Sequence, residues 1–121
     1  MTAYESPSGF SIFMTERELK LLCRALGDVV RLRIIRHLAD EREVSVSDLA
    51  GRLVISQPLA SWHLRILRRA GILSTRKDGR QVYCSLDRGR VSEFQDAVGD
   101  LIEPTTGKEQ LWEKSALPSS A

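Results

Sequence analysis

The stretch SQPLASWHLRILRRAG, residues 56–71, decides the fold of this chain. On a helical wheel its apolar residues gather on one side, which predicts an amphipathic helix that packs on a core by that side. The side predicted to be buried comprises Ala60, Leu64, Leu67 and Gly71. Ser56 is a favourable N-cap, Pro58 is tolerated in the first helical turn, and the final glycine ends the helix.

The opposite side of this predicted helix combines residue types that suit the major groove of DNA. Its members are Pro58, Ser61, Trp62, Arg65 and Arg69. An arginine can bond the O6 and N7 atoms of guanine, a serine can bond a base or a phosphate, and an aromatic ring can pack on thymine methyl groups. The helix start, at Ser56 and Gln57, adds backbone N–H groups that attract a phosphate. His63 completes the DNA-binding candidates, although a histidine at the flank of a buried side is more often packed or capping.

Apolar residues with a helical period predict four further helices, at residues 15–26, 28–39, 45–53 and 90–102. Asp28 is a suitable N-cap for the second of these, and Ser45 followed by Asp48 resembles a capping box at the start of the third. Only two residues separate this third helix from the helix at residues 56–71. Two short helices joined by a tight turn, the second of them basic, are the helix-turn-helix pattern.

Two β-prone runs follow the central helix, at residues 72–76 and 81–86. The turn between them contains Asp78-Gly79, which is a strong hairpin signal between such runs. A short strand at residues 43–44 could pair with this hairpin. We therefore predict a mainly α fold with a small β-wing, that is, a winged helix-turn-helix of five helices and a two- or three-stranded hairpin wing.

The net charge of the 121 residues is only +2, but the basic residues are concentrated in the middle of the chain. Residues 57–83 contain six basic residues and one acidic residue, whereas residues 92–121 contain six acidic residues and two lysines. This asymmetry indicates a local anionic partner. Arg76, Lys77 and Arg80 lie around the predicted hairpin turn, where a wing would contact the DNA backbone or minor groove and supply affinity.

Several classes of protein are disfavoured by the sequence. It contains no run of about 18 apolar residues and no secretory signal pattern, so we expect a cytoplasmic protein with no membrane partner. Cys23 and Cys84 do not make a disulfide scaffold. A serine–histidine–aspartate spacing, a phosphate-binding loop and an HExxH motif are all missing, so we expect neither enzymatic activity nor a cofactor.

Three segments resemble the arsenic-repressor (ArsR) family. Residues 25–35, ALGDVVRLRII, resemble its ALADPTRLRIL opening, residues 56–67 resemble its recognition helix, S-x-x-x-[VA]-S-x-H-L-x-x-L, and residues 70–83 resemble its wing. The resemblance implies a homodimeric DNA-binding repressor that leaves an inverted-repeat operator when an inducer binds. Its first and last helices would form the dimer interface, which here would use Leu19, Leu22, Leu26, Phe94, Val98 and Leu101.

We expect the chain to divide into three parts. Residues 1–14 would be a flexible N-terminal segment, and residues 15–103 would be the winged helix-turn-helix domain with a dimerisation helix at each end. Residues 104–121 would be a polar C-terminal tail.

The chain departs from the family at both of the family's metal-sensor positions. A cysteine pair in the pattern C-V-C-D-L on the third helix is replaced by Ser45 and Ser47, whose hydroxyls are poor ligands for thiophilic metals. The positions that match the sensor of the last helix hold Asp87, Gly89, Asp100 and Glu103. Without histidines a tight zinc site is not expected there, so we predict no metal. Asp87 is better interpreted as a helix N-cap, and Asp100 and Glu103 as solvated residues.

Two alternative functions stay open. The winged helix could serve protein–protein contact, although a docking surface would usually expose more apolar residues than this basic helix does. The chain could also be a thiol-redox-responsive regulator that uses Cys23 and Cys84, although the commoner role of such cysteines is that of small buried hydrophobic residues. The sequence does not identify the inducer.

Overall fold

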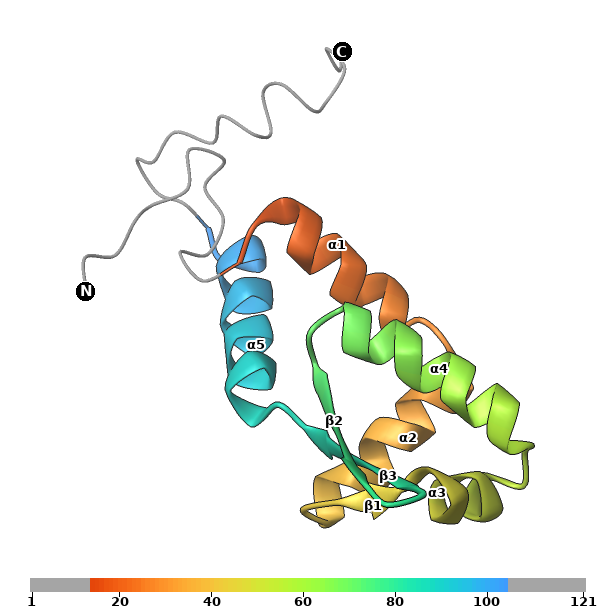
Figure 1. Ribbon diagram of the computed structural model, residues 1–121. Helices are drawn as coiled ribbons and strands as arrows, with labels where there is room; N and C mark the ends of the chain where they lie inside the picture. The colour runs from red at the N-terminus through yellow and green to blue at the C-terminus, as the bar shows by residue number, and fades with distance from the viewer. Residues whose placement is uncertain (1–13, 105–121) are drawn as a thin grey trace.

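Five helices and three strands make up the part of the chain that the computed structural model describes, residues 14–104 (Figure 1). In chain order these elements are α1 (Glu16–Ala25), α2 (Val29–Asp40), β1 (Val44–Ser45), α3 (Val46–Leu53), α4 (Gln57–Arg69), β2 (Leu73–Asp78), β3 (Gln81–Leu86) and α5 (Arg88–Ile102). The predicted winged helix-turn-helix is confirmed. The segments predicted at each end lie outside the described residues, except that Met14 is buried in the core and Pro104 is exposed.

Side-chain caps fix where the helices begin. At α1, the Thr15 backbone N–H donates to the Glu18 carboxylate at 2.9 Å, and the Glu18 N–H donates back to the Thr15 hydroxyl at 3.1 Å. The N-caps predicted from the sequence are confirmed and are Asp28, Ser45, Ser56 and Asp87. Each satisfies backbone N–H groups that a helix start would otherwise leave without a partner, and each contributes about 1 kcal/mol.

The wing is an antiparallel sheet with the strand order β1-β3-β2. Its first strand begins one residue later than predicted and pairs with β3 through Val44 and Cys84. In the hairpin, Thr75 lies opposite Cys84, and Lys77 lies opposite Val82. Because residues directly opposite each other share one face of a sheet, these four residues belong to the same face. That face is turned toward the helices, since Cys84 is fully buried.

The hydrophobic core lies between the helices and this inner face of the sheet. Its fully buried side chains include Leu22 from α1, Ile34 and Leu38 from α2, Leu49 from α3 and Leu67 from α4. Figure 1 shows α4 beside α1, and α4 contacts both α1 and strand β2 of the sheet. The wing therefore sits next to α4, and residues from both can form one surface. No helix within residues 14–104 is long and apolar enough to cross a membrane.

The apolar side of α1 that was predicted to form a dimer interface packs on the core of the chain instead. Leu19 and Leu22 are only 5% and 0% exposed, so they cannot contact a partner, and this part of the prediction is wrong. A helical wheel shows that a side is apolar, but it does not distinguish a side that packs on the chain's own core from one that packs on a second copy. The exposed apolar side chain of α1 is Leu21.

Candidate nucleic-acid interface

The side of α4 that was predicted to meet DNA is open to solvent. The exposed residues there are Ser61, Trp62, Arg65 and Arg69. The opposite side is buried, as predicted, through Ala60, Leu64 and Leu67. Within residues 14–104, neither Arg65 nor Arg69 has a carboxylate partner. Both guanidinium charges are therefore available to an anion.

The start of α4 is open as well. The Ser56 hydroxyl accepts a hydrogen bond from the backbone N–H of Leu59 at 3.2 Å, and Gln57 and Pro58 are exposed. Proline in the first turn lacks only an N–H that no helical hydrogen bond needs. This end of α4 carries the positive pole of the helix dipole, which favours a phosphate group.

His63 does not belong to the exposed surface, although the sequence placed it among the DNA-binding candidates. The residue is 5% exposed, and its Nδ1 atom lies 3.1 Å from Nη1 of Arg31. Because arginine is always protonated, Nδ1 is the acceptor in this pair. Burial lowers the pKa of the His63 imidazole, although the Asp28 carboxylate, 3.8 Å away, acts in the opposite direction. His63 therefore acts inside the protein, where its ring accepts the Arg31 hydrogen bond and positions α4, and it presents little surface to a ligand.

Arg31 is a positioning residue on α2 that was not among the residues predicted from the sequence. Its Nε donates to the backbone carbonyl of Ala25 at 2.6 Å, and its guanidinium lies 5.9 Å from the centre of the Trp62 ring. With its bond to His63, Arg31 thus links the end of α1 to the middle of α4. A signal was available, since Arg31 precedes the buried Ile34 and Leu38 by three and seven residues, which is the spacing of one helical face.

The wing offers fewer available charges than the sequence predicted. Arg76 forms two hydrogen bonds of 2.8 Å to the Glu43 carboxylate, lies 3.7 Å from Asp78, and stacks over the Tyr83 ring at 4.8 Å. The Arg76 guanidinium also holds the pKa of the Glu43 carboxyl below its usual range. Arg76 is therefore neutralised, which corrects the prediction that it is a free phosphate-binding charge. Lys77 and Arg80 are exposed and have no carboxylate partner among the described residues.

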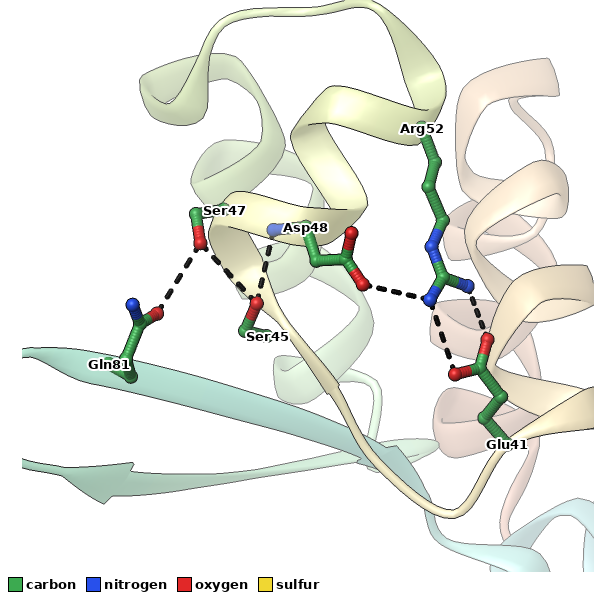
Figure 2. Close-up of polar contacts among 6 residues, drawn as sticks. All are labelled: Glu41, Ser45, Ser47, Asp48, Arg52 and Gln81. Carbon is green, nitrogen blue, oxygen red and sulfur yellow. Dashed lines mark hydrogen bonds and ion pairs between the residues drawn. The ribbon is translucent and has the colours of Figure 1, made fainter.

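The start of α3 replaces the family's cysteine pair with a network of hydrogen bonds (Figure 2). The Ser45 hydroxyl caps α3 through the Asp48 N–H at 3.1 Å and lies 3.4 Å from the Ser47 hydroxyl, which in turn donates to Gln81 on the wing at 3.4 Å. Farther along α3, Arg52 pairs with Asp48 and Glu41. The Ser47–Gln81 bond links α3 to the wing, whereas the Arg52–Glu41 pair links α3 to the end of α2.

Metal-ligating side chains do not gather in the described part of the chain. Residues 14–104 contain no group of three or more histidine, cysteine, aspartate or glutamate side chains that could hold a metal ion. Asp87 accepts a hydrogen bond from the Arg90 N–H at 3.0 Å, which confirms its role as the N-cap of α5. Asp100 and Glu103 are exposed, as expected.

Helices α1 and α5 contact each other, and each of them exposes apolar residues to solvent. Among the predicted dimer contacts, Leu101 is 40% exposed, whereas Leu26, Phe94 and Val98 are half-buried against the core. The sequence analysis did not select two further exposed residues, Leu21 at 47% and Ile102 at 74%. Arg90 holds the two helices together, with Glu18 of α1 at 3.5 Å and Glu93 of α5 at 2.8 Å.

The two cysteines differ in environment. Cys84 is fully buried in β3, and burial raises the pKa of its thiol to about 11. Cys23 is exposed on α1, so the expectation that both cysteines are buried is wrong for this residue. Both are free, and the buried Cys84 thiol is inert because it forms little of the reactive thiolate.

A helix-turn-helix made by α3 and α4, with an adjacent wing and an exposed basic side on the second helix, defines the class: a winged helix-turn-helix DNA-binding protein. Comparison with known proteins then gives the family. The sequence pattern described as "Bacterial regulatory protein, arsR family" matches residues 28–75. The chain belongs to the ArsR family of transcriptional regulators.

Individual relatives agree with this assignment. The chain is 38% identical over 81 residues to an uncharacterized HTH-type transcriptional regulator, YceK, of Bacillus subtilis, a match that covers 66% of this chain and 78% of that protein. It is 41% identical over 71 residues to the cadmium resistance transcriptional regulatory protein CadC homolog of Staphylococcus aureus, a match that spans only 59% of either protein. The structure of HlyU from Vibrio cholerae is similar with a TM-score of 0.59 and 33% identity, covering 74% of this chain and 98% of HlyU.

Proposed function

We propose that this protein is a homodimeric transcriptional repressor that binds an inverted-repeat DNA operator and leaves it when an inducer binds. The observation that carries the proposal is the exposed side of α4, where Arg65 and Arg69 have no carboxylate partner within residues 14–104. Lys77 and Arg80 extend the same positive charge onto the wing. In this arrangement α4 reads base edges and the wing binds phosphates.

A second copy of the chain would cover the outer sides of α1 and α5. Leu21, Leu101 and Ile102 are exposed there, and the half-buried Phe94 and Val98 continue the same apolar surface. A symmetric dimer would present two α4 helices to successive major-groove faces about 34 Å apart. An operator read in this way is an inverted repeat.

The proposed inducer is not a thiophilic metal bound at the two sensor positions of the family. Ser45 and Ser47 already hydrogen-bond to each other and toward the wing, and hydroxyls are poor ligands for such metals. Asp100 and Glu103 are exposed carboxylates without a histidine beside them in the sequence. The described residues do not favour the thiol-redox alternative either, because Cys84 is buried and its thiol pKa is raised.

The proposal includes no enzymatic activity, and relatives such as the CadC homolog of Staphylococcus aureus and the biofilm growth-associated repressor of Agrobacterium fabrum are named as regulators. HlyU is named a transcriptional activator, so the test below measures the direction of regulation as well as DNA binding. We expect the protein in the cytoplasm, where it would meet its operator.

Selection from a library of random DNA duplexes tests the function directly. The full chain should enrich sequences that share one inverted repeat, and a reporter gene placed behind that repeat should be expressed less when the protein is present. Failure to enrich any duplex would overturn the proposal in favour of a protein-docking module. Enrichment with raised reporter expression would make the protein an activator.

A further inference from the structure

A cavity of about 140 Å³ lies between α4 and the wing. Its inner wall is apolar and consists of the buried Leu64 with the half-buried Val46 and Val82. The exposed residues of its rim are Ser61, Arg65, Arg68 and Thr75. The cavity is thus apolar inside and offers hydroxyl and guanidinium groups at its mouth.

The charge at this mouth is positive and is not balanced from within the described chain. None of the lining residues is acidic. Within residues 14–104, neither Arg65 nor Arg68 has a carboxylate partner, and the one contact of Arg68 is a long hydrogen bond of 3.4 Å to the Thr75 hydroxyl. Lys77 lies opposite Val82 in the hairpin and therefore belongs to the same sheet face as the cavity wall. Arg76 lies on the other sheet face, opposite Tyr83, and its guanidinium is paired with the Glu43 carboxylate.

The volume limits what the cavity can hold. A buried cavity of about 150 Å³ accommodates one benzene molecule, so 140 Å³ fits a group of roughly six apolar atoms. A single water or an inorganic anion would leave Leu64, Val46 and Val82 without apolar contacts. A carboxylate attached to a small ring or branched chain would satisfy both parts of the site, because guanidinium groups bind carboxylates through charge-assisted hydrogen bonds.

We propose that this cavity binds a small apolar carboxylate, which acts as an effector by competing with DNA. Ser61 and Arg65 belong both to the cavity rim and to the DNA-reading side of α4, so the two ligands exclude each other. Release of DNA then needs no conformational change relayed from the dimer helices. This inference rests on the proposed function for its regulatory consequence, whereas binding of the carboxylate can be measured without DNA.

Benzoate is a suitable probe, with benzamide as its neutral counterpart and inorganic phosphate as an anion without an apolar part. Methyl NMR spectra of the full chain should show benzoate shifting the resonances of Leu64, Val46 and Val82. Benzamide and phosphate should each bind at least about tenfold more weakly, because each lacks one of the two required chemical features. Absence of benzoate shifts at these methyl groups, or equal affinities for benzoate and phosphate, would overturn the site.

Val82→Phe is designed to fill the cavity from the wing without changing any residue of the proposed DNA surface, and its folding is checked by thermal unfolding. This variant should lose the benzoate response and keep its DNA affinity within about twofold. If Val82→Phe is unfolded, Arg68→Gln replaces it and should weaken benzoate binding about tenfold while leaving benzamide binding unchanged. A variant that binds benzoate as the wild type does would contradict the assignment.

Competition with DNA separates the two proposals. Benzoate should release the wild-type protein from the selected duplex and should not release Val82→Phe. Carboxylate binding without release of DNA would overturn the regulatory role. A protein that binds benzoate but no DNA at all would overturn the proposed function and leave the carboxylate site standing.

Discussion

In the tight turn between α3 and α4, the backbone strain is concentrated at a single residue, Val54. It is the only residue other than glycine with a positive φ within residues 14–104, at φ 57° and ψ 48°. Left-handed backbone costs an L-residue about 1–2 kcal/mol, and a β-branched side chain is especially unsuited to it. The side chain is 88% exposed, so burial does not compensate for this cost.

Val54→Gly should therefore raise the free energy of unfolding by about 0.5–1 kcal/mol, after allowing for the greater flexibility of glycine in the unfolded chain. Urea denaturation measures the change. Val54→Ala is the matched control, because alanine keeps the Cβ atom that makes the conformation unfavourable. Equal stability of the two variants would show that the turn is not strained.

His63 should make the stability of the protein depend on pH. The folded chain holds its pKa below the value of about 6.5 that a histidine has when unfolded, because the ring is buried beside Arg31. The unfolded chain consequently binds a proton more readily as the pH falls through 6.5. The stabilisation is present above that pH and is lost below it, although the Asp28 carboxylate limits the loss.

Thermal unfolding between pH 7.5 and pH 5.5 measures this effect. Wild-type protein should lose more stability over this range than His63→Gln, whose amide oxygen can still accept the Arg31 hydrogen bond but cannot be protonated. His37 is present in both proteins and is cancelled by the comparison. Parallel stability curves for the two proteins would rule out a role for His63.

At the scale of elements, the wing should contribute to DNA affinity through Arg80 more than through Arg76. Arg80→Ala should weaken binding to all duplexes and reduce the slope of log affinity against log salt by about one, because one phosphate contact is lost. Arg76→Ala should change the slope much less, since Glu43 and Asp78 already neutralise this guanidinium. Titrations at several salt concentrations decide the matter, and equal slopes for both variants would contradict the ion pairing described here.

Local signals explain why the elements could be predicted from the sequence. The caps Asp28, Ser56 and Asp87 act on N–H groups within three residues, and the helical period of α4 depends only on its own residues. The predictions that were wrong or missing concern contacts between segments that are distant in the sequence. Arg76 meets Glu43 from 33 positions away, and Arg31 meets His63 across 32 positions. Neither pairing leaves a pattern in a single sequence.

In the candidate site, too, one part could be predicted from the sequence and another could not. The exposed side of α4 could be predicted because it is the complement of a buried side. The cavity between α4 and the wing could not, since Leu64 and Val82 are brought together by the packing of two elements. The assignment of Leu22 to a dimer interface was wrong for the related reason that a core and a homodimer interface both use apolar side chains.

At the scale of the whole molecule, the dimer should depend on the outer side of α5. Leu101→Asp places a charge beside the apolar Val98 and Ile102 of α5 and should shift the protein toward a monomer in sedimentation experiments at micromolar concentration. Ser92→Asp is the matched control, because this exposed residue lies about half a helical turn away from Leu101 around α5. A wild-type protein that sediments as a monomer at this concentration would contradict the proposed dimer.

The measurement that tests the central claim most directly is the affinity of Arg65→Ala for the selected duplex. Loss of this guanidinium should weaken binding by about 1–3 kcal/mol, which is roughly 5- to 150-fold, and should relax the preference at one base pair of each half-site. Arg36→Ala removes an exposed arginine that pairs with Asp40 on α2 and should bind as the wild type does. If Arg65→Ala binds the duplex with wild-type affinity and specificity, α4 does not read DNA by the side assigned to it.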